Sequence, residues 1–99
     1  MEEYILTIDE GTSSVRAILF NNSGKPVAME QMEINSYHPH PGWVEQDPEE
    51  IWNKTQIVVR GVIEKSGVGI KEIKAAGITN QRETTVMWDK KGHLYNVIG

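Results

Sequence analysis

The first third of the chain consists of three β-prone runs, mainly apolar in the first two and more polar in the third, and this pattern predicts strands. Residues 4–8 place apolar side chains on both faces, so we expect a central strand that is covered on two sides. Residues 15–20 also place apolar side chains on both faces, with Arg16 as the one charge, and end at the turn signal of residues 21–24. Residues 26–34 begin with proline and carry three polar side chains, which favours the edge of a sheet. The three runs predict an antiparallel meander.

The period then changes to that of a helix. Asp47 can cap the first turn, Pro48 suits the first helical position, and Glu50 stands where the carboxylate of a capping box returns to the cap. Lys65 in the last turn and Gly67 beyond it mark the end of the helix. We expect the acidic residues at its start to serve the helix dipole rather than catalysis. One face carries residues at helical spacing, namely Ile51, Thr55, Val58, Val59 and Val62.

The segment that joins the meander to this helix, residues 35–46, holds two prolines and a glycine, so we expect no regular structure there. We expect Trp43 to pin the segment to the body of the protein. His38 and His40 are residue types that bind metal ions, but no third ligand stands at a recognisable spacing. A solvated loop is therefore the interpretation that we prefer to a metal site.

After the helix, residues 73–79 read as a buried strand whose alanines and glycine allow close packing. A strand that follows a helix of this length usually lies parallel to its partner, through a right-handed crossover. Residues 84–88 predict another strand, residues 89–92 a turn, and residues 94–98 the start of one more strand. The order β-β-β-α-β predicts an α/β fold with a mixed sheet.

The turn between the first two strands has the composition of a phosphate grip. A lone carboxylate ends the first strand, a glycine and three hydroxyl residues form the turn, and one cation follows in the second strand. Glycine lets the backbone approach a phosphate, successive amides can bind an anion, and a carboxylate can hold Mg²⁺ through water. The alternative is an ordinary hairpin with a polar turn, which is much commoner. The candidate residues are Asp9, Gly11, Thr12, Ser13, Ser14 and Arg16.

A second polar cluster, residues 80–84, follows the strand at residues 73–79. In open α/β sheets, ligands bind at the carboxyl ends of the strands. Arg82 beside Glu83 would offer donors and acceptors together, which suits a polyhydroxylated substrate. The alternative is a loop with a solvent-facing ion pair, and position alone does not separate the two.

Composition restricts the classes of function. The 99 residues fit one domain, and a net charge of −4 with scattered Lys and Arg gives no support for nucleic-acid binding. The chain has no cysteine, which suits a reducing compartment, and no apolar run near the length of a membrane span. We therefore expect a cytoplasmic protein with no membrane partner.

Three blocks, residues 9–16, 41–52 and 77–85, closely resemble the N-terminal region of the FGGY carbohydrate kinases, at the spacing of that family. The third block is similar to the members that phosphorylate glycerol. The resemblance covers essentially the whole chain. It implies the ribonuclease H-like fold of the actin-like ATPases, here incomplete, because the family's proteins are roughly five times as long. We therefore interpret residues 1–99 as the N-terminal part of the first kinase domain, inactive by itself.

The resemblance also implies an activity, the ATP-dependent phosphorylation of glycerol to sn-glycerol 3-phosphate. Carried over by position, Asp9 serves the Mg²⁺–phosphate centre, and Thr12, Ser13 and Ser14 contact the phosphates of ATP or ADP. Arg16 then lies near the transferred phosphoryl group. The remaining pair, Arg82 and Glu83, hydrogen-bonds the hydroxyls of glycerol.

Two positions depart from the family pattern, with Glu10 where Gln is usual and Gln46 where His is frequent. An extra carboxylate at Glu10 beside a triphosphate would weaken nucleotide binding. Two alternatives stay open, another sugar kinase of the same family and a noncatalytic fragment or binding module. Unpaired strand edges and uncovered apolar surface favour self-association, so we expect a homo-oligomer.

Overall fold

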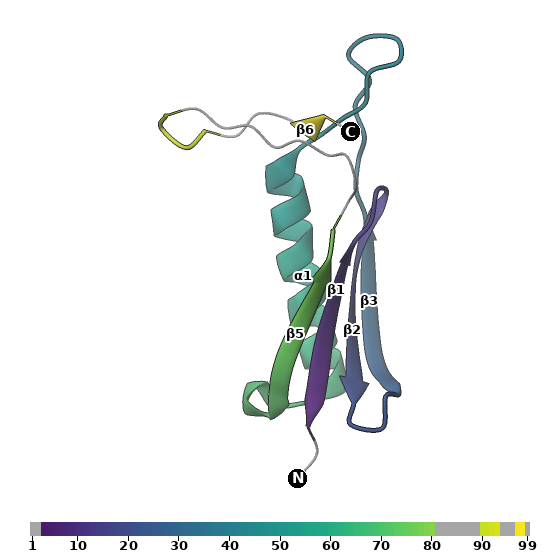
Figure 1. Ribbon diagram of the computed structural model, residues 1–99, viewed down its shortest axis with the longest axis vertical. Helices are drawn as coiled ribbons and strands as arrows, with labels where there is room; N and C mark the ends of the chain where they lie inside the picture. Colours follow the sequence, from purple (N-terminus) through teal and green to yellow (C-terminus); the bar gives the residue numbers. More distant parts are fainter. Residues whose placement is uncertain (1–2, 81–89, 94–96, 99) are drawn as a thin grey trace.

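The computed structural model describes residues 3–80, 90–93 and 97–98, and its main feature is a four-stranded sheet (Figure 1). The strand order is β3-β2-β1-β5. Strand β2 pairs antiparallel with both β1 and β3, whereas β5 pairs parallel with β1. The predicted mixed sheet and β-β-β-α-β order are therefore confirmed. The strands are β1 (Tyr4–Glu10), β2 (Ser14–Asn21), β3 (Pro26–Glu33) and β5 (Ile73–Thr79).

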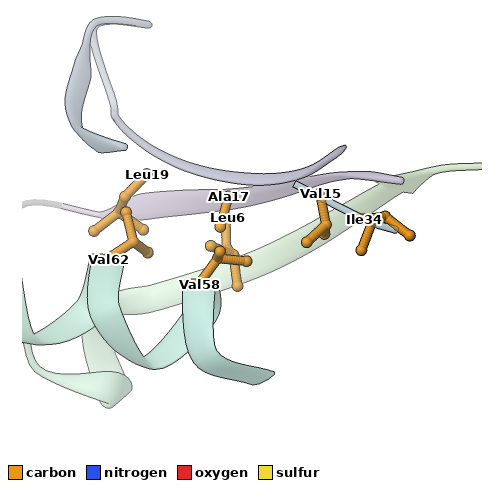
Figure 2. Packing of buried hydrophobic residues seen from close by; sticks show 7 residues of the cluster. All are labelled: Leu6, Val15, Ala17, Leu19, Ile34, Val58 and Val62. Carbon is orange, nitrogen blue, oxygen red and sulfur yellow. The ribbon is translucent and has the colours of Figure 1, made fainter. Parts of the chain in front are cut away.

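One long helix, α1 (Pro48–Ser66), lies across one face of this sheet (Figure 1). It packs on β2 and β3. Figure 2 shows the inward side chains of the sheet packed against those of the helix. In β1 and β2 every second residue points to this core, as a strand period of two predicts. The core consists of Leu6, Val15, Ala17, Leu19, Ile34, Val58 and Val62.

The helix begins and ends where the sequence predicts. The Asp47 carboxylate accepts the amide of Glu49 at 2.9 Å, and Gly67 closes the helix in the left-handed conformation with φ 72°. The prediction that Glu50 completes a capping box is wrong. Its carboxylate accepts the amide of Asn35 at 2.8 Å and the ammonium of Lys54 at 2.9 Å, so it ties the incoming loop to the helix instead of returning to the cap.

The expectation that β5 is a buried strand is also wrong for the part of the chain that the structure describes. Beyond its first residue β5 is exposed, and Ile78 is 69% exposed. The physical reason is position: β5 is an edge strand, and α1 covers β2 and β3 rather than β5. Strand β1 is central as predicted, but Ile5 on its second face is 47% exposed. Among the described elements, α1 covers only one face of the sheet (Figure 1).

The segment at residues 35–46 contains regular structure that the sequence did not predict. Strand β4 (Glu45–Gln46) pairs antiparallel with β6 (Val97–Ile98), and Tyr37 bridges Glu45. Trp43 does not anchor the loop to the body, because it is 54% exposed and stacks edge-to-face on His40 within the loop.

Several shorter features complete the described chain. A 3₁₀ turn, η1 (Ile70–Glu72), precedes β5, and the turn predicted at residues 89–92 appears at Lys90 and Lys91, followed by Gly92 with φ 84°. The strand predicted at residues 84–88 lies outside the described residues. No described helix is long and apolar enough to cross a membrane.

Candidate functional site

Three polar side chains converge at the carboxyl ends of β1 and β5. Asp9 lies directly opposite Arg16 in the β1–β2 register and opposite Thr79 in the β1–β5 register. Arg16 Nη2 donates to Asp9 Oδ2 at 3.1 Å, and the Thr79 hydroxyl donates to Asp9 Oδ1 at 2.9 Å. Because β1 and β5 are parallel, their ends meet at the same edge of the sheet, as the sequence predicts for a ligand site in such sheets.

These contacts fix the charge of the carboxylate. The hydrogen bond from Thr79, followed by that from Arg16, holds the pKa of Asp9 below its ordinary value. Asp9 is therefore an anion throughout the neutral range, although its side chain is still 47% exposed. An ionised and accessible carboxylate is the form that a hydrated Mg²⁺ ion binds.

In the turn between β1 and β2, three backbone carbonyl oxygens accept hydrogen bonds from other groups of the protein. The amide of Gly11 donates to the carbonyl of Ser14 at 2.9 Å, and the amide of Ile34 donates to the carbonyl of Ser13 at 2.8 Å. The side chain of Gln46 donates to the carbonyl of Thr12. All three carbonyls thus accept hydrogen bonds from the protein, which leaves the backbone little freedom to rearrange.

The amides of the same turn remain available. Within the described residues, no acceptor takes the N–H of Thr12 or Ser13, and both residues are exposed. Gly11 is needed where the turn closes, because a Cβ there would lie 3.0 Å from the carbonyl oxygen of Ser14. A turn with bonded carbonyls and open amides can bind an anion.

Two further polar groups border the turn. The hydroxyl of Ser14 accepts a hydrogen bond from Gln31 at 3.1 Å on the face that also carries Arg16. Arg16 bonds Asp9 through Nη2 only, and its buried Nε has no partner among the described residues. The guanidinium therefore has unused donors beside the Asp9 carboxylate.

Glu10 does not face this cluster. Successive residues of a strand point to opposite faces, and the Glu10 carboxylate meets the hydroxyl of Thr55 on α1 at 2.6 Å. Thr55 is buried between the helix and the sheet. The departure from the family pattern at Glu10 thus lies on the helix side of the sheet, opposite to Asp9.

The structure brings together most of the predicted site. Asp9 and Arg16 form an ion pair, and the turn of Gly11 to Ser13 joins their two strands. Figure 1 shows this turn, the end of β5 and the first turn of α1 at one end of the sheet. Arg82 and Glu83 lie outside the described residues.

Sequence reasoning missed two residues of the site, Thr79 and Gln46. Thr79 is the last residue of a predicted parallel strand, and that position was a signal that it would meet Asp9. Gln46 stood out only as a departure from the family pattern, and nothing local indicated its contact with Thr12, which joins residues 34 positions apart through a loop.

The described residues contain no group of three or more His, Cys, Asp or Glu that can hold a metal ion. His38 Nδ1 lies 3.2 Å from the carbonyl oxygen of Trp43, so this ring serves the loop. Asp9 is a single carboxylate, which fits the way Mg²⁺ is usually held, by one or two carboxylates, water and substrate phosphates.

Comparison with known proteins shows the family to which the chain belongs. Residues 4–99 match the family described as "FGGY family of carbohydrate kinases, N-terminal domain". The chain is 53% identical over 100 residues to glycerol kinase of Bacillus subtilis (strain 168) and 52% identical to that of Thermoanaerobacter sp. (strain X514). In both cases the match covers 99% of this chain and 20% of the relative.

A solved structure shares the fold as well. The crystal structure of Plasmodium falciparum glycerol kinase with ADP superposes with a TM-score of 0.86 at 31% identity. The superposition covers 97% of this chain and 20% of that one. The chain therefore spans about a fifth of the length of the relatives that it matches.

Proposed function

Because the chain belongs to the FGGY family of carbohydrate kinases, through their N-terminal domain, we propose that it is part of an enzyme that phosphorylates glycerol. The reaction transfers the terminal phosphoryl group of ATP to a terminal hydroxyl and gives sn-glycerol 3-phosphate. Identity of about half of the residues to glycerol kinases supports the choice of substrate over other sugars of the family. We place the reaction in the cytoplasm, since a chain without cysteine suits a reducing compartment.

One observation carries the nucleotide half of the proposal, namely the turn whose carbonyls are bonded and whose amides are open. Gly11, Thr12, Ser13 and Ser14 bind the phosphates of ATP or ADP through these amides and through hydroxyls. Fixed donors stabilise the charge of a transferring phosphoryl group without reorganising.

Arg16 supplies positive charge to the transferred phosphoryl group. Its pairing with Asp9 through Nη2 holds the guanidinium at the end of β1, and the side chain is still 41% exposed, so donors other than the buried Nε remain for phosphate oxygens. A guanidinium is suited to this role because it stays charged and can bond two oxygens at once.

Asp9 holds Mg²⁺ through water. The ionised, half-exposed carboxylate fits such a role, and Mg²⁺ when bound neutralises charge on the phosphates. The chain's own contribution is to keep this carboxylate ionised and oriented by Thr79 and Arg16.

Arg82 and Glu83 bind the hydroxyls of glycerol. They follow β5 by three residues or four, and β5 ends beside Asp9. This arrangement supports a polyol site close to the phosphate turn, as transfer between bound substrates requires.

Turnover belongs to a longer protein in this proposal, since the chain covers 20% of its relatives. The test is a coupled ADP-release assay on the full-length protein with glycerol and, separately, with a pentulose. Activity on glycerol that is lost in Asp9→Asn supports the proposal. Activity on the pentulose but not on glycerol contradicts it.

A second candidate applies to the 99-residue chain alone, as a noncatalytic fragment that self-associates. Among the described strands one edge of β5 is unpaired, and this edge and the exposed side chains of Ile70 (74%) and Ile78 (69%) favour it. Sedimentation of the isolated chain tests this candidate, because a monomer at micromolar concentration contradicts it.

A further inference from the structure

One side chain connects the phosphate turn to a distant part of the chain. Gln46 lies in β4, is 4% exposed, and donates from Nε2 to the carbonyl oxygen of Thr12 at 2.5 Å. Among the described residues, it is the only side chain that bonds the backbone of residues 11–13. Its second neighbour, the Ser36 hydroxyl, is 3.5 Å away, a long contact.

The backbone of Gln46 is itself fixed. Gln46 pairs with Val97 in the β4–β6 ladder, and the next residue, Asp47, caps α1. A side chain that extends from such a rigid segment has few alternative rotamers. The residue is also buried, so the hydrogen bond to Thr12 lies away from solvent, where the loss of a partner is costly.

The geometry of the peptide bond gives this contact a consequence for the ligand site. The carbonyl of Thr12 and the N–H of Ser13 belong to one planar, trans peptide unit, so they point in opposite directions. When Gln46 draws the Thr12 carbonyl inward, the Ser13 N–H is turned outward. No acceptor in the described part of the chain takes that N–H.

We propose that Gln46 is a positioning residue of the phosphate site, which acts through the Thr12 carbonyl to aim the Ser13 amide at a phosphate of the nucleotide. This inference rests on the proposed function, because it assigns the turn to ATP or ADP. Gln46 itself touches neither substrate. Its contribution is the orientation of one backbone donor before the nucleotide binds.

Two substitutions in the full-length protein separate positioning from packing. Gln46→Met keeps the length and volume of the side chain but removes the donor, whereas Gln46→His changes the shape but offers a ring N–H. Positioning predicts that Gln46→Met weakens ADP binding roughly ten-fold and that Gln46→His stays within about three-fold of wild type. A packing role predicts the reverse order.

The measurements are calorimetry with ADP and steady-state kinetics with each substrate varied. We expect Gln46→Met to raise the KM for ATP and to leave the KM for glycerol unchanged. The control is Gln56→Met, a half-buried residue of α1 outside the site, which should leave both constants unchanged. If Gln46→Met does not fold, Gln46→His alone decides, because a ten-fold loss of ADP affinity in that variant overturns the inference.

The outcomes distinguish this inference from the proposed function. Wild-type protein that binds ADP but does not phosphorylate glycerol contradicts the proposed function alone. Equal ADP affinity of wild type and Gln46→Met contradicts the positioning role alone. Parallel increases in both KM values in Gln46→Met also overturn it, because they indicate a general disturbance of the fold.

Discussion

Thr79 and Asp9 are 70 positions apart in the sequence, and the hydroxyl of the first donates to the carboxylate of the second at 2.9 Å. The contact exists because β5 runs parallel to β1 with these two residues in register. The contact connects β5 to Asp9, the carboxylate proposed to hold Mg²⁺. The polar block at residues 80–84 follows β5 directly in the sequence. Thr79 thereby belongs to the site through its effect on Asp9.

Thr79→Val in the full-length protein removes the largest cause of the low pKa of Asp9. The pKa of Asp9 then rises, so the carboxylate is protonated at a higher pH than in wild type. We expect the acidic limb of the pH profile of kcat/KM for ATP to move to higher pH, and kcat/KM at neutral pH to fall roughly five-fold. Thr7→Val is the matched control, because within the described part of the chain the Thr7 hydroxyl bonds just the carbonyl of Ile18, at 3.4 Å. An unchanged acidic limb would show that Thr79 does not set the charge of Asp9.

Arg16→Gln tests the cation proposed for the transferred phosphoryl group. We expect kcat to fall roughly a hundred-fold with little change in the KM for glycerol, and Arg16→Lys to recover part of the loss as a point charge. Stability should hardly change, because the pair with Asp9 is 41% and 47% exposed and such pairs contribute little. Steady-state kinetics and thermal melting give the two readouts.

The control for this prediction is Arg60→Gln, which removes a cation from the exposed face of α1. It should leave kcat unchanged. If Arg16→Gln lowers the melting temperature by many degrees and kcat only slightly, Arg16 is a structural residue and not a catalytic one.

Local signals in the sequence predicted most of the fold. Alternation identified β1, β2 and β3, and Asp47, Pro48 and Gly67 marked the helix, because caps and periods depend on neighbouring residues. The exposure of β5 and the pairing of β4 with β6 were not predicted. Both depend on which elements lie beside them in space, and no local pattern records that.

The residues of the site also fall into two groups, those that local sequence identified and those that depend on tertiary contacts. Asp9 and Arg16 were predicted as site residues from the carboxylate and the cation that flank a short polar turn, and in the structure the hairpin register places them opposite each other. Thr79 and Gln46 reach the same place through a crossover and through a loop, and their contacts depend on tertiary register. The expected effect of Glu10 assumed proximity in sequence, whereas the pleat directs its side chain to Thr55.

Glu10→Gln tests whether the charge of Glu10 reaches the nucleotide. The carboxylate lies on the helix side of the sheet and is bonded to Thr55, so it is screened from the turn by the strand itself. The amide of Gln can accept the same hydrogen bond. We therefore expect the KM for ATP to stay within about three-fold of wild type, while Asp9→Asn in the same strand abolishes activity. A ten-fold gain in ATP affinity in Glu10→Gln would mean that its charge does reach the nucleotide.

The contact between Glu50 and the loop at residues 35–46 gives a prediction about pH and stability. The hydrogen bond from the amide of Asn35, followed by that from Lys54, holds the pKa of Glu50 below its ordinary value. A carboxylate with a lowered pKa in the folded state stabilises the protein above the pKa of the unfolded state. That contribution is lost as the pH falls through the folded pKa.

Glu50→Gln should therefore lower the free energy of unfolding by about 1.5 kcal/mol at pH 7, because the charged acceptor of two donors is replaced by a neutral one. The difference from wild type should shrink as the pH falls below the pKa of the unfolded state and through the lowered pKa of Glu50 in the folded state, where Glu50 itself becomes protonated. Urea unfolding at pH 7 and at pH 3.5 measures both values. Glu49→Gln is the matched control, since Glu49 lies in the same helical turn but is exposed and should change stability by less than about 0.5 kcal/mol. A deficit of equal size at both pH values would show that Glu50 acts through packing and not through its charge.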